Sequence, residues 1–362
     1  MKVKEFRTHP LQLPYRNPMK TATNYFDTTA GLLVEAVTDR EDRGYGYADL
    51  FPRTGESILT AQAIIHGVLA PGLTGRDPGE VQILLEWMDK KVGGNRRAKA
   101  ALETALQDLR GKAVKVPVYE LLGGAVRRTV SVMRMVGLKQ PEGMAEEAIT
   151  LVREGFKALK LKIGTGWKED TERVRQVRNA VGDKIFLKVD ANQSYSVQEA
   201  LRVARGLEEF GVETFEQPVA ADDWEGMIFL TQQSPVPIEA DQTVRSVADA
   251  LRAIRLGAAS VINTSPQKAG GISRAKQIAD LCEIARIPCI LSNIGGSVVG
   301  DAAAVQVIAA SQSTHLPCEV GEFQRVNDDP AAGLEVRNGE LQVPNAPGLG
   351  VKIAFREYKQ SQ

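Results

Sequence analysis

Cysteine and histidine are both scarce in this chain of 362 residues, which has three of each. Cys282, Cys289 and Cys318 lack the spacing of a metal site, and pairing any two would leave the third free. The sequence therefore predicts neither a cysteine-ligated metal centre nor a disulfide framework. A reduced, cytoplasmic compartment is the simplest interpretation.

The chain also lacks a net charge and a long apolar run. Its 45 lysines and arginines balance 45 acidic residues, so no global field favours nucleic acid or an anionic membrane as a partner. No stretch approaches the roughly 18 apolar residues that a membrane span needs. The amino terminus alternates like a strand and carries no apolar signal segment. We expect a soluble protein that is not exported.

Strand-like and helix-like patterns alternate from about residue 128 onward. Eight short apolar runs are candidate strands, at 129–136, 158–163, 185–192, 214–219, 237–242, 261–268, 288–293 and 315–320. Amphipathic helical patterns lie between them, for example at 169–181, 196–210 and 273–286. This alternation predicts parallel strands joined by right-handed crossovers. Eight such units predict an α/β fold, a closed (β/α)8 barrel of the TIM type.

The two ends of the chain do not follow this repeat. Residues 1–125 are predicted to form a separate α+β capping domain, ahead of a barrel over 126–322. Its strand-like runs are 2–13, 30–39 and 43–49, and its helical runs are 56–69, 78–90 and 96–114. Residues 323–362 are rich in turn sequences, and we expect them to pack back on the capping domain.

Acidic residues mark the ends of three neighbouring predicted strands, namely Asp190, Glu216 and Asp241. In such a barrel the carboxyl ends of the strands carry the chemistry. Taken singly, each of these residues could be an exposed loop carboxylate. Together they form a set of oxygen ligands without histidine or cysteine, which suits Mg²⁺, or Mn²⁺ in its place.

Lysines mark two further strands. The run K-A-L-K-L-K-I at 157–163 alternates like a strand, so Lys160 and Lys162 point the same way. Two interpretations are open. Either both side chains face outward and are solvated, or both face inward, where burying the charge costs free energy. Lys268 ends predicted strand six, which lies half-way round the ring from strand two, so it is predicted to face Lys162 across the mouth. A nearby cation and a second ammonium would lower the pKa of Lys162 toward that of a general base, and Lys160 could hold a substrate carboxylate.

The ordered motifs K-L-K, V-D-A-N, E-Q-P, E-A-D-Q and Q-K-A-G-G, on a barrel behind a capping domain, resemble the enolase superfamily and its muconate-lactonizing-enzyme subgroup. The resemblance spans nearly the whole chain. It implies that Asp190, Glu216 and Asp241 hold Mg²⁺, that Lys162 and Lys268 form an acid/base pair, and that Lys160 lies beside the substrate carboxylate. It also implies a homo-oligomer. None of the histidines fits the His–Asp pair of the mandelate-racemase subgroup, which favours the lysine subgroup.

Residues that would select the substrate are less well marked. Glu319 on strand eight corresponds in position to a glutamate of the muconate cycloisomerases, with a rim salt bridge as the alternative role. Asn293 ends strand seven. The resemblance implies that a loop at 16–27 and the segment around Phe51 cover the mouth, which makes Tyr25 and Arg53 candidate substrate contacts, against a structural or solvent-exposed role for each.

We therefore expect an enzyme that acts on a small-molecule carboxylate. Its reaction is predicted to remove the proton α to that carboxylate through an enolate, with Mg²⁺ and Lys160 stabilising the negative charge. Racemisation or epimerisation of an amino-acid-like or related small carboxylate is the leading outcome. Muconate-type cycloisomerisation and dehydration use the same residues. A lysine Schiff-base aldolase with Lys162 as nucleophile and a non-enzymatic barrel are the remaining alternatives.

Overall fold

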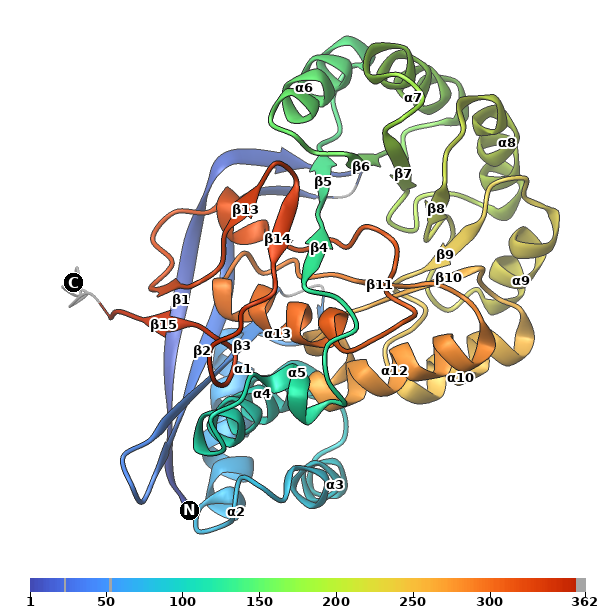
Figure 1. Ribbon diagram of the computed structural model, residues 1–362. Coiled ribbons are helices and arrows are strands. Elements are labelled where there is room, and N and C mark those ends of the chain that lie inside the picture. The colour runs from blue at the N-terminus through green and yellow to red at the C-terminus, as the bar shows by residue number, and fades with distance from the viewer. Residues whose placement is uncertain (23, 52–53, 356–362) are drawn as a thin grey trace.

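A computed structural model describes residues 1–22, 24–51 and 54–355 (Figure 1). The amino-terminal part is an antiparallel sheet in the order β1-β2-β3, with helices packed on one face. The strands are β1 (Val3–Lys20), β2 (Tyr25–Thr38) and β3 (Arg43–Asp49). The helices are α1 (Ile58–Ile64), the π-helical turn η2 (Ile65–Leu69), α2 (Ala70–Leu73), α3 (Val81–Lys91), α4 (Arg96–Ala113) and α5 (Val118–Leu121). This arrangement confirms the predicted α+β capping domain.

The segment 16–27 was predicted to be a loop over the mouth; the loop assignment is wrong, because most of the segment belongs to the β1–β2 hairpin, but its residues Met19 and Phe26 do line the pocket. The pairing shifts register between Pro14 and Met19 and then continues to the pair Lys20 and Tyr25. The tip of the hairpin reaches the barrel near β5 and β6 (Figure 1). There the carbonyl of Lys20 accepts a hydrogen bond from the Leu138 amide at 2.8 Å. The hairpin is thus anchored at the end that overhangs the barrel.

The second part is a curled parallel sheet surrounded by helices, which confirms the predicted α/β barrel. Its strands lie in the order β11-β10-β9-β8-β7-β6-β5, so each pairs with its neighbour in sequence. They are β5 (Met133–Val136), β6 (Ala158–Lys162), β7 (Phe186–Asp190), β8 (Thr214–Glu216), β9 (Ile238–Ala240), β10 (Val261–Thr264) and β11 (Cys289–Leu291). The helices are α6 (Pro141–Arg153), α7 (Trp167–Val181), α8 (Val197–Leu207), the 3₁₀ turn η3 (Glu208–Phe210), α9 (Trp224–Gln233), α10 (Val247–Leu256), α11 (Pro266–Ala269), α12 (Ile272–Ala285) and α13 (Val298–Ala309).

Two residues complete the ring where a full eighth strand was predicted at 315–320. Cys318 exchanges two backbone hydrogen bonds with Ser131, the last residue of β4 (Thr129–Ser131), and Met133, the first residue of β5. Glu319 exchanges two with Leu291 of β11 and Asn293 just after it, and all four measure 2.8–2.9 Å. Pro317 has no N–H to extend the pairing on one side. Gly321 turns the chain on the other side with a φ of 86°. The eighth strand is therefore shortened to a bridge.

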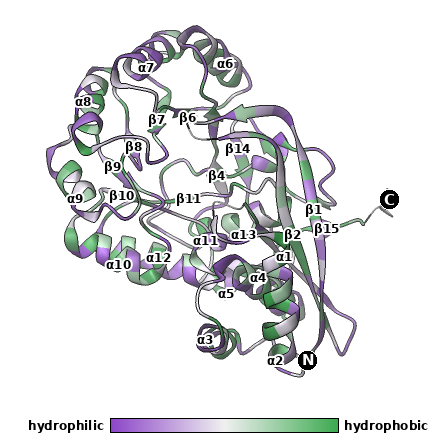
Figure 2. Ribbon diagram, turned by 180° about the vertical axis from the view of Figure 1, so that it is seen from behind, coloured by the Kyte–Doolittle hydropathy of each residue, from purple (hydrophilic) through white to green (hydrophobic). Residues whose placement is uncertain are grey.

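Amphipathic helices form the outer layer of the barrel. In α8 the buried residues are Ala200, Val203, Ala204 and Leu207, a spacing that places them on one helix face. The Ser196 hydroxyl begins the helix by accepting a hydrogen bond from the Glu199 amide. Figure 2 shows hydrophilic and hydrophobic residues alternating along α10 and α12. None of the helices formed by the described residues has the length and apolar composition that crossing a membrane requires.

Side chains of the cap hold the barrel directly. The Glu103 carboxylate, on α4, accepts hydrogen bonds from the amides of Ile272 (2.6 Å) and Ser273 (3.1 Å), which begin α12. Tyr47, on β3, donates its hydroxyl proton to the carbonyl of Gly295 at 2.9 Å. A Cβ at Gly295 would lie 2.7 Å from the Tyr47 ring, so this contact leaves no room for a side chain.

The carboxy-terminal segment contacts both parts of the molecule. It begins with the 3₁₀ turn η4 (Glu322–Arg325), and its strands are β12 (Ala331–Ala332), β13 (Val336–Arg337), β14 (Glu340–Gln342) and β15 (Lys352–Ile353). β14 pairs with β4, which leads into the first barrel strand, β5. The Leu349 amide donates to the Asp108 carboxylate of the cap at 2.8 Å. The domain boundaries at residues 125 and 322 stay a prediction.

Candidate active site

The predicted site residues converge on a pocket at the carboxyl ends of the barrel strands. Its walls include Lys160, Lys162, Asp190, Glu216, Asp241, Asn293 and Glu319 from the barrel. Met19, Phe26 and Phe51 of the cap line the same pocket. A wider cleft of about 750 Å³ adjoins it, shares Asp241 with it and is lined by Lys268. Barrel and cap therefore enclose one connected space.

Lys162 ends β6 and points into the barrel, where its side chain is buried. Its ammonium donates to Asp190 Oδ2 at 2.6 Å and to Asn192 Oδ1 at 2.9 Å. Burial lowers the pKa of Lys162; the Asp190 carboxylate opposes this shift and the Lys160 ammonium reinforces it. A lysine with a lowered pKa is suited to accept a proton near neutral pH.

Lys160 points the same way from two residues earlier, so the lysine pair of this strand faces inward. Its ammonium lies 3.0 Å from Asp190 Oδ2, 2.9 Å from Glu216 Oε2 and 2.7 Å from Glu319 Oε2. Burial disfavours the charge, but these carboxylates outweigh burial and raise the pKa of Lys160 well above its usual range. Lys160 therefore stays a fixed positive charge beside Lys162.

Lys268 lies on α11, the short helix that follows β10, and is partly exposed to the cleft. Its ammonium donates to Asp241 Oδ1 at 2.5 Å and to the carbonyls of Asp241 and Asn263, both at 2.8 Å. Three strands separate β10 from β6 on one side of the ring, and two strands and the Glu319 bridge separate them on the other. Lys162 and Lys268 therefore approach the mouth from opposite sides.

The three predicted metal ligands follow one another around the rim. Asp190 and Glu216 end β7 and β8 and are paired in register, and Asp241 comes directly after β9. Burial and the adjacent Asp190 charge raise the pKa of Glu216 well above its usual range. For Asp190, burial acts in the same direction, but Lys160 and Lys162 overcome it and lower the pKa. Negative charge is thus crowded at this rim.

Two polar side chains hold these residues in place. Asn192 donates to Asp190 with its backbone amide at 2.8 Å and its side-chain amide at 3.1 Å. The Gln217 side-chain oxygen accepts from the Asp241 amide at 3.1 Å and the Thr243 amide at 3.0 Å. Asn192 and Gln217 both have positive φ, at 47° and 36°, as residues held at functional sites often do. They fix the backbone of the rim.

A second polar layer lies below the mouth and was not predicted from the sequence. The floor layer consists of Lys160, Lys188, Thr214, Glu239, Asn263 and Glu319. The layer above it, the mouth layer, consists of Lys162, Asp190, Glu216, Asp241 and Lys268. Four floor residues, Lys160, Lys188, Thr214 and Glu239, each lie two residues before a residue of the mouth layer. The sequence does contain a signal for this layer. Lys188 and Asp190, like Glu239 and Asp241, are two residues apart on a strand, so they face the same way, as Lys160 and Lys162 do.

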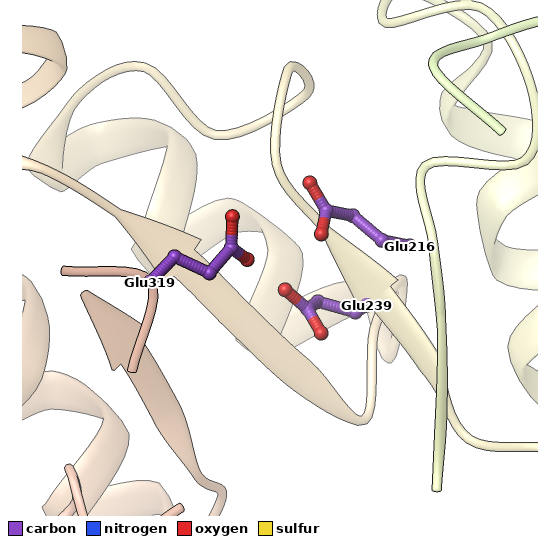
Figure 3. A group of neighbouring side chains, drawn as sticks. All are labelled: Glu216, Glu239 and Glu319. Atoms are coloured by element: carbon purple, nitrogen blue, oxygen red, sulfur yellow. The ribbon is translucent and has the colours of Figure 1, made fainter. Parts of the chain in front are cut away.

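Lys188 is the centre of the floor layer and is fully buried. Its ammonium lies 2.5 Å from Glu216 Oε2 and 2.5 Å from Glu319 Oε1, and it donates to Glu239 Oε1. Figure 3 shows the carboxylates of Glu216, Glu239 and Glu319 pointing toward one another. Ligand oxygens of these three lie within 4.8 Å of one another, a spacing that could hold a metal ion. This group shares only Glu216 with the predicted metal triad.

The Glu319 carboxylate is already paired with other barrel side chains, although the residue lines the pocket. It pairs with Lys160 and Lys188, and it accepts from Asn263 Nδ2 at 2.9 Å. Burial opposes its charge, but the two lysines lower the pKa of Glu319 to about 2. The geometry favours an internal salt bridge over the substrate contact predicted for Glu319.

The other predicted substrate contacts differ in their placement. Asn293 lines the pocket and is buried. Tyr25 is 66% exposed and does not line the pocket, whereas Phe26 does, because adjacent strand residues face opposite ways. Arg53 lies outside the described residues. The capping segment therefore contributes Phe26, next to the residue that was predicted.

Comparison with known families accounts for most of the chain. Residues 4–123 match the N-terminal domain of the mandelate racemase / muconate lactonizing enzyme family. Residues 143–358 match the enolase C-terminal domain-like family. Both matches lie on the parts that carry the cap and the barrel.

Individual relatives are similar along nearly their whole length. An L-Ala-D/L-Glu epimerase from Clostridium acetobutylicum is 31% identical over 97% of this chain and 99% of its own. Muconate cycloisomerase 1 from Rhodococcus opacus is 32% identical over 95% of this chain and 94% of its own length. The structure of a dipeptide epimerase from Enterococcus faecalis, complexed with Mg and L-Leu-L-Tyr, is similar with a TM-score of 0.93 at 30% identity, covering 97% of this chain and all of that one. These relatives share one architecture and differ in substrate.

Proposed function

Because this chain belongs to the mandelate racemase/muconate lactonizing enzyme family of the enolase superfamily, we propose that it removes the proton α to a substrate carboxylate in a Mg²⁺-dependent 1,1-proton transfer. The chain is an isomerase of this superfamily, in which its curated relatives are epimerases, racemases and cycloisomerases. The observation that carries the proposal is the approach of Lys162 and Lys268 to one mouth from opposite sides. Two bases on opposite faces of a carbon invert its configuration.

The mouth layer suits a divalent cation. It contains three carboxylates and two ammonium groups, a formal charge of −1, and its donors are oxygens, which Mg²⁺ prefers. Asp190, Glu216 and Asp241 would hold the ion. Bound there, Mg²⁺ would supply electrostatic stabilisation of the negative charge that develops on the substrate carboxylate.

The chain's own residues divide the proton transfer between them. Lys162 takes the α-proton from one face, and its lowered pKa keeps a fraction of it neutral. Lys160 remains charged beside it and stabilises the enolate. Lys268 delivers a proton to the opposite face. Met19, Phe26 and Phe51 cover the pocket and exclude the water that would otherwise protonate the enolate.

The pairing of the acidic residues bears on the substrate. Among the described residues, every acidic side chain that lines the pocket has a basic partner on this chain, as Glu319 has in Lys160 and Lys188, and Glu322 in Arg134 at 3.7 Å. None of the described carboxylates in this pocket is therefore left without a basic partner to bind a free α-ammonium group. We therefore favour a carboxylate whose α-nitrogen is acylated over a dipeptide with a free amino terminus.

The test is solvent isotope uptake in D₂O with Mg²⁺ present. N-acyl amino acids, dipeptides and muconates are incubated with the protein, and recovered substrate is analysed by NMR and mass spectrometry. We expect deuterium at C2 of an N-acyl amino acid, loss of the signal with EDTA and recovery with added Mg²⁺. Cycloisomerisation, the activity named for the Rhodococcus opacus relative, would appear as loss of the muconate ultraviolet band without deuterium at C2 of any acid. That result would replace the proposal.

A further inference from the structure

Among the described residues, a group of three glutamates that could hold a metal ion does not coincide with the proposed magnesium ligands. Oxygens of Glu216, Glu239 and Glu319 lie within 4.8 Å of one another, whereas Asp190 and Asp241 belong to the rim above. Glu216 is common to both sets. A divalent cation that entered the barrel would therefore meet two alternative positions, and only the upper one lies where Lys162 and Lys268 meet.

Lys188 fills the lower position. Its ammonium makes an ion pair with each of the three carboxylates, at 2.5 Å from Glu216 and from Glu319 and in a shorter contact with Glu239. Two neutral groups complete the layer: Thr214 donates to Glu239 Oε2 at 2.9 Å, and Asn263 donates to Glu239 Oε1 at 3.0 Å. A cation already sits at the centre of the triad, supplied by the chain itself.

Burial makes Lys188 difficult to displace. Lys188 and Glu239 have no exposed surface, and withdrawing the ammonium would leave it in the barrel interior without a counter-charge, which is strongly unfavourable. The mouth lysines differ, because Lys162 and Lys268 line the pocket and the cleft. An arriving ion can displace their ammonium groups into solvated space.

We propose that Lys188 is a positioning residue which occupies the floor of the barrel as a fixed cation and so confines the divalent ion to the mouth. The inference rests on the proposed function, since it assumes that the mouth binds Mg²⁺. It assigns Glu239 the role of anchoring Lys188. It also makes Glu216 the residue shared by the permanent cation, Lys188, and the exchangeable cation, Mg²⁺.

The test counts Mg²⁺ ions bound per chain by isothermal titration calorimetry, with Mg²⁺ alone as the probe. The native chain is expected to bind one equivalent. Lys188→Met removes the internal cation and keeps the side-chain length, so we expect two equivalents, together with a fall in kcat of at least tenfold from the misplaced charge. One equivalent with unchanged affinity in Lys188→Met would overturn the inference.

A double variant separates exclusion of the ion from a merely structural effect. Lys188→Met combined with Glu239→Met removes the triad as well as its cation, and we expect a single equivalent of Mg²⁺ again. Two equivalents in the double variant would contradict the inference. If Lys188→Met does not fold, Lys188→Gln, whose amide still donates to the carboxylates, takes its place with the same expected count. A native chain that binds no Mg²⁺ would instead refute the proposed function.

Discussion

The floor layer and the mouth layer of the barrel are built from neighbouring positions on the same strands, yet they differ in charge and in access. The floor contains Lys160 and Lys188 against Glu239 and Glu319, so its formal charges cancel. The mouth contains two lysines against three carboxylates. The centre of the floor is closed, since Lys188 and Glu239 have no exposed surface, although Lys160 and Glu319 also line the pocket. The mouth opens into the pocket and the cleft.

The difference shows how one fold separates stability from reactivity. The interior of a (β/α)8 barrel is usually filled with branched apolar side chains. Here an ionic layer replaces part of that filling, and its charges are satisfied internally. The layer above is short of one positive charge, which leaves it ready to bind a cation and an anionic substrate. Changes in the two layers are therefore expected to have different consequences.

The largest effect is expected from the mouth lysines. Lys162→Met and Lys268→Met should each lower the rate of inversion by about 10²–10⁴-fold, the usual contribution of a general acid or base. Each variant should still exchange the α-proton of one enantiomer, because the opposite base is intact. NMR of each enantiomer in D₂O measures this. Exchange of the same enantiomer by both variants would contradict the placement of the lysines on opposite faces.

A floor carboxylate should matter more for stability. Glu239→Ala leaves the buried ammonium of Lys188 short of a partner, and breaking a buried ion pair in this way costs about 3–5 kcal/mol. The matched mouth variant, Asp241→Ala, should cost only about 1 kcal/mol, since its partner Lys268 is partly exposed and can be hydrated. Urea unfolding in the absence of Mg²⁺ measures both. Equal losses of the free energy of unfolding would remove the distinction between the layers.

The cap offers a smaller effect that extends the comparison beyond the barrel. Phe26 lines the pocket and packs edge-on against Phe51 with ring centroids 5.9 Å apart. Phe26→Ala should raise KM about tenfold, equivalent to roughly 1.4 kcal/mol of lost apolar contact. Tyr25→Ala is the control, because Tyr25 is exposed, and its KM should change less than about twofold. Steady-state kinetics on the substrate identified by deuterium uptake decides between them.

A pH-dependent effect concerns the segment that carries Glu319. Asp301, on α13, accepts hydrogen bonds from the amides of Gly321 (2.9 Å) and Phe323 (3.1 Å). Burial raises the pKa of Asp301 to about 7, against the pull of these amides. The folded chain thus keeps a proton that the unfolded chain has lost, so this contribution to stability is full below about pH 4 and declines as the pH rises to about 7.

Asp301→Asn should remove this part of the pH dependence. Urea unfolding of the native chain and of the variant between pH 4 and 8 gives the two slopes. We expect the free energy of unfolding of the native chain to fall more steeply with pH than that of the variant. Parallel curves would show that Asp301 does not titrate in this range.

The mouth could be predicted from the sequence because polar residues at strand ends interrupt an otherwise apolar pattern. Asp190, Glu216 and Asp241 were recognised in this way, and all three line the pocket. Lys188 and Glu239 were missed, since they lie inside strands where burial gives no reason to expect a charge. Only their contacts across the barrel, with partners some 50 to 130 residues away, reveal why they are there.

The cap shows a different limit. Tyr25 and Phe26 are equally plausible pocket residues from composition, and a shift of one residue in strand register exchanges their faces. The register here depends on the irregular pairing between Pro14 and Met19. Local sequence does not specify where such an irregularity falls. The choice between the two aromatic residues therefore required the structure.

The two-residue bridge at Cys318 and Glu319 has a consequence for synthesis of the chain. The strands that it joins, β5 and β11, are complete by residue 291, but their outer edges stay unpaired until the bridge has left the ribosome. Unpaired strand edges invite association with other chains, and contacts between residues so distant in sequence form slowly. The nascent barrel is therefore expected to remain an open sheet, exposed to association with other chains, until residue 319 becomes available.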